Sequence, residues 1–330
     1  MAPVTVLEGI QKSAAFLARK GVESPRLQAE LLLAHVLNVP RMQLYLNFER
    51  ILTAAETDKL RTLIQRRGRR EPAQHIVGST SFCGLEIAVN RQVLVPRPET
   101  ELLAESGSNF LNQLSTLNPP AAPGQLATSK CNAGGFEGGQ PATALDFGTG
   151  SGCIAITLAV RCPGARVFAI DISAEALEVA KSNAASHRVD DRIKFFQGDG
   201  FAALPHAFRF DLIVSNPPYV PSAEIESLQP EVCDYDPRAA LDGGLDGLDF
   251  FRRLAAEAQP FLKPQGRIML ELGDGQAPAV TTIFEKQNWI VQAVKEDYTR
   301  RPRFLIVQLA PGFLATDEHR SKQQDANFAN

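Results

Sequence analysis

The sequence lacks long hydrophobic runs, a cysteine framework and a strong excess of charge. No apolar run reaches the ~18 residues that a membrane-spanning helix needs, and the first residues, MAPVTVLEGIQK, resemble neither a signal peptide nor a transit peptide. The five cysteines are scattered, with no CxxC pair and no histidine at ligand spacing, which disfavours disulfide bonds and a zinc site. We therefore expect a cytoplasmic protein that holds no metal.

The small net charge of −3 hides an uneven distribution. Residues 1–75 hold twelve Lys and Arg against seven Asp and Glu, so the remainder of the chain is acidic. The basic residues are densest in KLRTLIQRRGRR, Lys59 to Arg70, which either follows a phosphate backbone, contacts an acidic protein face, or forms a solvated helix face. A pI near 6.0 disfavours a protein built mainly to hold nucleic acid.

Residues 1–74 predict a small helical bundle, because apolar residues recur at three- and four-residue spacing. Ser24 followed by Pro25 predicts a capped helix start before LQAELLLAHVL. Thr53 with Glu56 predicts a capping box at the start of a later helix. We expect this bundle to act as a substrate-docking domain.

Residues 75–97 carry β-branched and aromatic residues around Gly78 and Gly84, which predicts a β-hairpin linker. Residues 98–310 then alternate between strand and helix patterns, which predicts a parallel sheet covered on both faces. The expected strands are ATALDF, ARVFAI, IKFFQ, FDLIVS and RIMLEL, followed by WIVQAVKED and RFLIVQL as an antiparallel pair at the sheet edge.

Two segments predict little fixed structure. Residues 118–141 are rich in Gly and Pro and poor in apolar residues, so they are expected to form a flexible insertion. Residues 311–330 form a polar tail that we expect to be disordered. The insertion contains Gly138-Gly139-Gln140, for which chance in a glycine-rich stretch is favoured over a functional role.

A glycine-rich turn lies where a predicted strand runs into a predicted helix, in LDFGTGSGCIAITLA. Its glycines let the backbone approach a ligand closely, and the start of the helix offers free amide donors. The spacing is GxGxG, with Cys153 where a dinucleotide fingerprint has its third glycine, so NAD is disfavoured. A tight turn without a ligand is the alternative. The candidate cofactor-binding residues here are Gly148, Thr149, Gly150, Ser151 and Gly152.

Acidic residues close the next two predicted strands. Asp171 ends ARVFAI, where a carboxylate is able to accept hydrogen bonds from both hydroxyls of a ribose. Its alternative role is to cap the next helix, but Ser173 serves equally well and leaves Asp171 free. Asp199 ends the following strand, where its carboxylate or the backbone at Gly200 is placed to contact an adenine, with Phe201 packing on the adenine face.

The most specific motif is Asn216-Pro217-Pro218-Tyr219, directly after FDLIVS. The lone pair of an amide or exocyclic amine nitrogen is delocalised, so a catalyst has to localise it. If the Asn216 side-chain oxygen and the Pro217 carbonyl each accept one N–H of a substrate –NH2, the lone pair turns toward a methyl donor, and Tyr219 packs against the planar group. Both prolines hold these acceptors in place beforehand. A rigid turn without function is the alternative.

Together these segments resemble the peptide chain release factor glutamine methyltransferases. The likeness extends over residues 1 to about 310, and VLVPRPETE and DYDPRAALDGGLDG are narrower signatures than NPPY, which adenine-N6 and guanine-N2 methyltransferases share. The resemblance implies a class I, Rossmann-like seven-stranded sheet and S-adenosyl-L-methionine as the cofactor. It also implies a protein substrate, the GGQ glutamine of class I release factors, methylated at N5.

By the same resemblance, the turn from Gly148 to Gly152, Asp171 and Asn216 contact the cofactor, and the residues from Asn216 to Tyr219 hold the glutamine. The resemblance also places Arg97, Glu99 and Thr100 beside the cleft, without assigned roles.

Two positions depart from the family pattern. Gly200 stands where many relatives have tryptophan, so adenine stacking passes to Phe201 or weakens. Between Asp297 and Arg303, Arg300 stands where the family often has glycine, which predicts a changed turn.

Two other functions stay open at this point. An adenine-N6 methyltransferase acting on DNA or RNA would need a surface that reads nucleic acid and flips a base, which an acidic catalytic half does not indicate. A module that binds S-adenosyl-L-methionine or a ribosomal partner without catalysis is the other, and an intact Asn216 argues against it.

Overall fold

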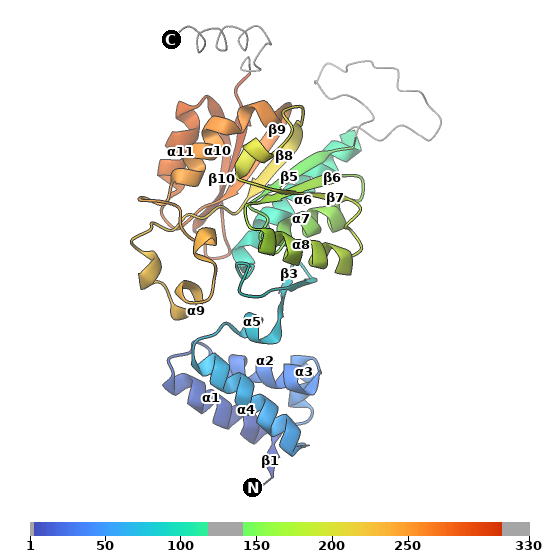
Figure 1. Cartoon of the computed structure of the whole chain (residues 1–330), viewed down its shortest axis with the longest axis vertical. Coiled ribbons are helices and arrows are strands. Elements are labelled where there is room, and N and C mark those ends of the chain that lie inside the picture. Colours follow the sequence, from blue (N-terminus) through green and yellow to red (C-terminus); the bar gives the residue numbers. More distant parts are fainter. Residues whose placement is uncertain (1–2, 118–140, 312–330) are drawn as a thin grey trace, which may run out of the picture. The chain divides into compact units, whose positions relative to one another are not determined.

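The computed structural model describes residues 3–117 and 141–311, which form two compact units (Figure 1). The chain divides between them in several stretches: the first unit has residues 1–80, 88–95 and 226–237, and the second has residues 81–87, 96–225 and 238–330. The predicted insertion, apart from Pro141, and the predicted tail beyond Pro311 lie outside the described residues. No helix of the described part is long and apolar enough to cross a membrane.

The first unit confirms the predicted helical bundle. Its helices are α1 (Val6–Arg19), α2 (Pro25–Leu37), α3 (Arg41–Tyr45), α4 (Ala54–Gly68) and α5 (Ala73–Val77), with a short antiparallel pair, β1 (Val4–Thr5) and β2 (Ile51–Leu52). The helices bury a shared apolar core, to which Ile10, Leu33 and Leu63 contribute from α1, α2 and α4. This burial of one face per helix is what the three- and four-residue apolar spacing predicts.

One of the two predicted helix caps is present. The Thr53 side chain accepts a hydrogen bond from the Glu56 amide, and the Glu56 side chain accepts one from the Thr53 amide, so the capping box of α4 is confirmed. The predicted Ser24 cap is wrong, because Ser24 has a left-handed φ of +46° and its side chain bonds no helix amide. Pro25 does start α2, where its missing N–H has no cost.

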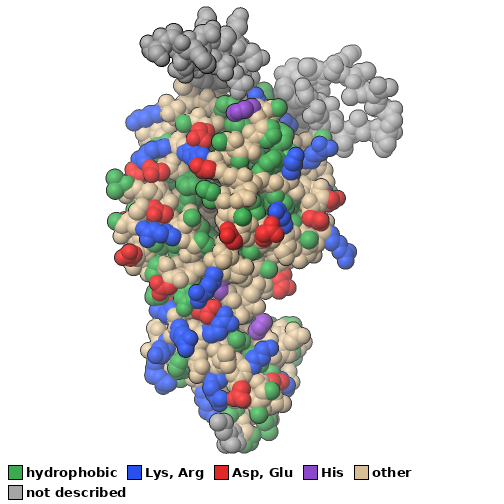
Figure 2. Space-filling view, viewed as in Figure 1, with side chains coloured by type: hydrophobic (Ala, Val, Ile, Leu, Met, Phe, Trp, Pro, Cys, Tyr) green, Lys and Arg blue, Asp and Glu red, His purple; other side chains and the backbone are tan. Residues whose placement is uncertain are grey.

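Several arginines of the basic segment are paired within their own unit. The Arg66 guanidinium donates two hydrogen bonds to Glu71 and holds the pKa of that carboxyl below its usual range. Arg67 and Arg70 both contact Glu231, from the stretch 226–237. Other Lys and Arg side chains lie on the face of this unit seen in Figure 2. The segment therefore has a structural role that the sequence did not indicate.

The predicted linker hairpin is present in shortened form. Strands β3 (Ser79–Phe82) and β4 (Leu85–Ala88) pair, and the two residues between them, Cys83 and Gly84, both have positive φ, as in a type I′ turn. The residues just before β3 form the helix α5 instead of a strand, so the predicted hairpin began too early.

The second unit contains a seven-stranded sheet in the order β10-β11-β9-β8-β5-β6-β7, which confirms the expected fold class. Its strands are β5 (Thr143–Phe147), β6 (Arg166–Asp171), β7 (Ile193–Gln197), β8 (Phe210–Ser215), β9 (Leu262–Glu271), β10 (Trp289–Glu296) and β11 (Pro302–Leu309). The first five run parallel, and β11 pairs antiparallel with both β9 and β10, as the sequence predicts for the edge. The chain order reverses between β5 and β8, which is where open α/β sheets bind ligands.

Helices pack on both faces of this sheet (Figure 1). On β8, Ile213 joins the core formed with α10 and α11, whereas the neighbouring Leu212 faces α6, where a Cβ atom added at Gly107 would lie 3.1 Å from Leu212 Cδ2. Successive side chains of a strand point to opposite faces, so these two helix groups lie on opposite sides. The helices of this unit are α6 (Pro98–Leu117), α7 (Cys153–Arg161), α8 (Ala174–Ser186), α10 (Asp249–Glu257) and α11 (Ala277–Lys286), whereas the short helix α9 (Pro230–Cys233) belongs to the first unit.

The turn between β10 and β11 contains Arg300 with a φ of +62°. The arginine thus adopts the left-handed conformation that favours glycine. That conformation costs a non-glycine residue about 1–2 kcal/mol. A glycine at this position would avoid the strain, but it would lose more backbone entropy on folding, so its net gain in stability would be smaller.

We expect Arg300→Gly to raise the free energy of unfolding by roughly 0.5–1 kcal/mol, because glycine relieves this strain. Urea denaturation measures the change. Arg300→Ala is the matched control, since it removes the side chain but keeps the strain, and its stability should stay close to the parent's. A less stable glycine variant would show that the arginine side chain outweighs the strain.

Candidate active site

A glycine loop follows β5 at the centre of the sheet. Gly148, Gly150 and Gly152 have φ values of +76°, +54° and +81°. A Cβ atom added at Gly148 or Gly150 would meet no atom within 4 Å, whereas at Gly152 it would lie 3.0 Å from the Cβ of Ala180 on α8. The first two glycines therefore leave room for a ligand beside the backbone, and the third lets α7 and α8 pack closely.

Asp146 ties this loop to the start of α7. Its side chain is fully buried, and Oδ2 accepts hydrogen bonds from the Thr149 hydroxyl at 2.6 Å and from the Ala155 amide at 3.0 Å. Burial raises the pKa of Asp146 to about 7. The Asp146 carboxyl thus fixes the glycine loop, whereas the sequence predicted this residue only as part of a strand.

Asp171 lies at the end of β6, beside the glycine loop. Its Oδ2 accepts from the Gly150 amide at 2.8 Å and its Oδ1 from the Ser173 amide at 3.0 Å. Ser173 caps α8 through the Ala176 amide as predicted, so Asp171 is not the side-chain cap of that helix. A carboxylate has about four acceptor sites, so each oxygen retains capacity for another donor.

Asp199, after β7, pairs with an arginine that the sequence did not indicate. Arg253 of α10 forms an ion pair with the Asp199 carboxylate and donates to its backbone oxygen at 2.9 Å. A Cβ atom at Gly200 would lie 2.5 Å from an Nη atom of Arg253. The guanidinium therefore covers the position where a side chain at residue 200 would begin.

Phe201 does not offer a ring face to a ligand. It is buried, stacks on Phe261 with ring centroids 4.8 Å apart, and tilts against Phe147 at 4.9 Å. The prediction that Phe201 packs on an adenine face is wrong, because the sheet core takes up this aromatic ring.

The Asn216-Pro217-Pro218-Tyr219 motif follows β8, next to the glycine loop. The two strands are hydrogen-bonded neighbours, and Ser215 donates from its hydroxyl to the Phe147 carbonyl at 2.6 Å. Both prolines are buried, whereas Asn216 and Tyr219 are half-buried. The sheet thus brings the motif and the glycine loop together at the point of chain reversal.

The stretch LDGGLDG fixes the backbone behind this motif. The Val220 amide donates to the Leu241 carbonyl, and the Gly243 amide donates to the Val220 carbonyl, both at 2.9 Å. A Cβ atom at Gly243 would lie 2.8 Å from the Cα of Tyr219, so only glycine fits there. Gln276 donates from Nε2 to the Tyr219 carbonyl at 2.9 Å. Residues 241–247 and Gln276 therefore fix the backbone at the end of the motif, at Tyr219 and Val220.

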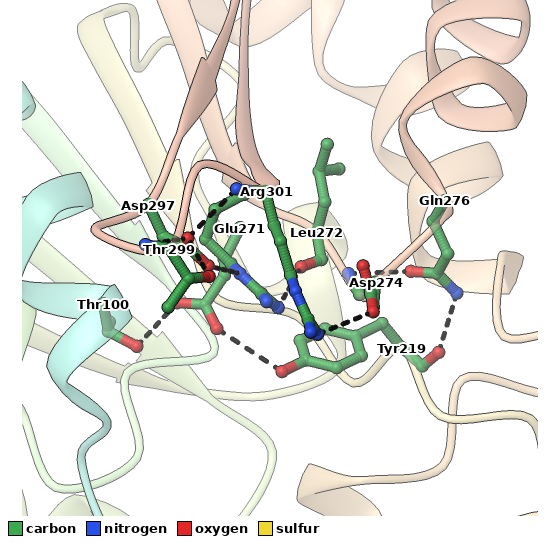
Figure 3. Close-up of polar contacts among 11 residues, drawn as sticks. Thr100, Tyr219, Glu271, Leu272, Asp274, Gln276, Asp297, Thr299 and Arg301 are labelled. Atoms are coloured by element: carbon green, nitrogen blue, oxygen red, sulfur yellow. Dashed lines mark hydrogen bonds and ion pairs between the residues drawn. The ribbon is translucent and has the colours of Figure 1, made fainter.

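Glu271 connects the motif to α6 (Figure 3). It ends β9, is 1% exposed, and accepts hydrogen bonds from the Thr100 hydroxyl at 2.6 Å and the Tyr219 hydroxyl at 3.4 Å. Asn216 donates from Nδ2 to Thr100 Oγ1 at 3.1 Å. Burial raises the pKa of Glu271 to about 7 and also raises the pKa of Tyr219. Glu271 was not predicted as a site residue, although it closes a parallel strand in the same way as Asp171, and this position was the signal in the sequence that could have indicated its role.

Arg303 and Asp297 form an ion pair near this carboxyl. Arg303 donates from Nε to Asp297 at 3.2 Å and from Nη1 to the Leu272 carbonyl at 3.1 Å. Hydrogen bonds from Thr299 hold the pKa of Asp297 well below its usual range. The positive charge of Arg303 opposes the effect of burial on the pKa of Glu271. Within the described residues, no group of three or more His, Cys, Asp or Glu is suited to hold a metal ion.

Comparison with known proteins identifies the family. Residues 8–78 match the PrmC N-terminal domain, and residues 136–230 match the methyltransferase small domain. A release factor glutamine methyltransferase of Geobacter sulfurreducens is 42% identical over 282 residues, which cover 86% of this chain and 89% of that protein. This chain belongs to the release factor glutamine methyltransferase family.

Further members of the release factor glutamine methyltransferase family agree. One from Chlorobaculum tepidum is 41% identical over 307 residues, covering 91% of this chain and 96% of that protein. The resemblance stated from the sequence and the expected methyltransferase activity are thereby confirmed. Among solved structures, a ribosomal protein L11 methylase from Lactobacillus delbrueckii matches with a TM-score of 0.42 at 20% identity, over 64% of this chain and 79% of that one. That likeness is distant, and the family rests on the sequence relatives.

Proposed function

We propose that this protein transfers a methyl group from S-adenosyl-L-methionine to the side-chain amide nitrogen, N5, of the glutamine in the GGQ tripeptide of class I release factors. One observation carries the proposal. Asn216 and its motif lie beside the glycine loop, on the neighbouring strand, in a chain that is 42% identical to a release factor glutamine methyltransferase. An acceptor for an –NH2 group is thus next to a loop suited to a nucleoside-like cofactor.

The glycine loop and its neighbours fit that cofactor. Gly148 and Gly150 leave open space at the carboxyl end of β5. The free backbone amides at the start of the following helix favour a negatively charged group there, such as the carboxylate of the cofactor's methionine part. We propose that Asp171 binds the ribose hydroxyls, because each of its oxygens retains capacity to accept another hydrogen bond. We propose that the adenine lies near Asp199 and Gly200, with the Arg253 guanidinium beside it in place of an aromatic ring. The proposed cofactor-binding set is Gly148, Thr149, Gly150, Ser151, Gly152, Asp171, Asp199, Gly200 and Asn216.

The chemistry needs orientation more than acid–base catalysis. When bound, the cofactor supplies a methyl group on a positively charged sulfur. Asn216 Oδ1 and the Pro217 carbonyl each accept one N–H of the glutamine amide, and the Tyr219 ring packs on the amide plane, so the nitrogen lone pair faces the methyl carbon. This nitrogen would accept the methyl group with loss of the S–CH3 bond, whose electron pair would stay on the sulfur, and the nitrogen would release one proton.

The nucleic-acid alternative has less support. Arg66, Arg67 and Arg70, within the basic segment, are bound to carboxylates of their own unit, which reduces the charge available for phosphates.

We propose that residues 1–74 dock the release factor, that residues 75–97 are the linker, and that residues 98–310 carry the reaction. A translation factor as the partner implies a cytoplasmic enzyme.

The experiment that tests the function incubates the full-length protein with methyl-labelled S-adenosyl-L-methionine and an intact class I release factor. Mass spectrometry should place one methyl group on the GGQ glutamine. A release factor with GGA in its place is the control and should stay unlabelled. Faster labelling of adenine in DNA or RNA would favour the alternative function and overturn this one.

Asp171→Ala is expected to raise the KM for S-adenosyl-L-methionine by about tenfold or more with a smaller change in kcat, since a ribose contact is present equally in the ground and transition states. Initial rates at varied cofactor concentration measure both constants. Asp171→Asn is the matched control, because an amide oxygen is able to keep the bond from the Gly150 amide. An unchanged KM with a collapsed kcat would assign Asp171 a different role.

A further inference from the structure

Three polar side chains form a chain of hydrogen bonds that ends at Asn216. Thr100 lies in the first turn of α6 and is 2% exposed, and Glu271 at the end of β9 is 1% exposed. The Thr100 hydroxyl lies 2.6 Å from Glu271 Oε2 and 3.1 Å from Asn216 Nδ2 (Figure 3 shows the Thr100 and Tyr219 contacts of this carboxyl). Thr100 therefore contacts the candidate catalytic amide directly, and Glu271 is linked to that amide through Thr100.

The hydrogens available decide the direction of each bond. An ionised carboxylate only accepts, so the single hydroxyl hydrogen of Thr100 goes to Glu271. The Thr100 oxygen is then left as an acceptor, and the only donor on the Asn216 side chain is its NH2 group. Within residues 3–117 and 141–311, no donor reaches Asn216 Oδ1. The carbonyl oxygen of Asn216 is therefore the atom left for a substrate.

We propose that Thr100 and Glu271 are positioning residues that fix the orientation of the Asn216 amide, so that its oxygen and not its NH2 group meets the N–H of the substrate. This inference rests on the proposed function. In the opposite orientation, two N–H donors would face each other at the reacting nitrogen, and the lone pair would not be directed toward the methyl group. A glutamine and an asparagine side chain carry the same amide group, so orientation is what makes one the acceptor and the other the donor.

The charge of Glu271 controls this polarity. Its pKa is raised to about 7, chiefly by burial and to a lesser extent by Glu99, whereas Thr100, Arg303 and Tyr219 act in the opposite direction. A protonated Glu271 is able to donate to Thr100, whose own hydrogen is then free to turn toward Asn216. We therefore expect kcat to rise as pH increases through about 7.

The stability effect of Glu271 has the opposite sign. Its pKa in the folded protein lies above the ordinary value of 4.5, so the stabilisation from the neutral form is present at low pH and is lost as the pH rises through about 7. If kcat rises with pH while the free energy of unfolding falls, the rise in kcat is not caused by a more stable fold. This comparison therefore separates the positioning role of Glu271 from a general effect on folding.

The first test replaces Thr100 with valine, which keeps the shape and removes the hydroxyl. We expect kcat on the release factor to fall roughly 10- to 100-fold, the KM for the release factor to change little, and Thr100→Ser to recover to within roughly threefold of the parent. Ser108→Ala is the matched control, because it removes a buried hydroxyl of the same helix that donates to the Ala104 carbonyl and, within the described residues, bonds to neither Asn216 nor Glu271. The proposal is overturned if the valine variant keeps more than half of kcat, or if serine is as impaired as valine.

The second test replaces Glu271 with glutamine and covers the case in which the Thr100 variant fails to fold. The glutamine oxygen still accepts from Thr100 but does not titrate, so kcat should become nearly independent of pH from about 6 to about 8. A pH profile identical to that of the parent protein would contradict the proposal.

A third measurement needs no substrate and so separates this inference from the proposed function. In protein labelled with 15N-asparagine, hydrogen exchange of the Asn216 side-chain NH2 should be slow in the parent and fast in Thr100→Val. If the parent does not methylate the GGQ glutamine but shows this difference, the function fails and the positioning role stands. If exchange is equally fast in both, the positioning role fails.

Discussion

Replacing Asn216 with alanine is expected to lower kcat for glutamine methylation by about 10²–10³-fold and to change the affinity for S-adenosyl-L-methionine by less than about threefold. The substitution removes the oxygen that accepts one N–H of the reacting amide, an interaction that is strongest in the transition state. The only hydrogen bond that the Asn216 side chain makes within the described residues is to Thr100, so its loss leaves β8 intact. Single-turnover rates at saturating cofactor measure the effect.

The controls for this variant are its fold and its cofactor binding. Thermal unfolding and calorimetric titration with S-adenosyl-L-methionine should match the parent within error. Asn216→Asp should be nearly as inactive as the alanine variant, because a carboxylate accepts hydrogen bonds but has no NH2 group for Thr100. Retention of more than a tenth of the parent rate by Asn216→Ala would contradict the catalytic role.

Removing residues 1–74 is expected to reduce kcat/KM on an intact release factor on the order of 100-fold. A single glutamine on a protein surface offers little contact area, so its positioning must come from a remote docking surface. Cofactor binding should survive, since the proposed cofactor residues lie beyond Gly148. Initial rates on the full release factor, together with calorimetric titration of the cofactor, measure both outcomes.

The structure dictates the control for this truncation. Arg67 and Arg70, which the deletion removes, are the ion-pair partners of the half-buried Glu231, so the fragment should also carry Glu231→Gln to avoid leaving that charge unpaired. The same fragment should methylate a short GGQ peptide at nearly the parent's low rate. A fragment that methylates the full release factor at the parent rate would rule out docking by the bundle.

The elements predicted well from the sequence are those set by local pattern. The strands around Leu145 and Ile213 are continuous apolar runs because both sheet faces are covered, and the capping box at Thr53 needs only neighbours three residues apart. Ser24 shows the limit of such rules. It has the residue type of a cap, but its left-handed backbone turns the side chain away from the helix amides.

The candidate site was predictable where one segment carries the whole geometry. The glycine loop and the Asn216 motif are contiguous, so their roles follow from backbone chemistry. Thr100 and Glu271 meet only because α6 and β9 pack together, and no spacing in the sequence relates residues that far apart. Phe201 failed for the same reason, since the sheet core, not its neighbours in sequence, decides where that ring packs.

Residues 226–237 pack in the first unit although they follow the Asn216 motif in the sequence. A ribosome adds roughly 5–20 residues per second, so the segment that carries Arg67 and Arg70, at and just after the end of α4, leaves the exit tunnel many seconds before Glu231 is made. During that interval, Arg67 and Arg70 lack the Glu231 carboxylate with which they form ion pairs in the folded protein. The amino-terminal bundle is therefore the first part of the protein to be synthesised but among the last to be completed.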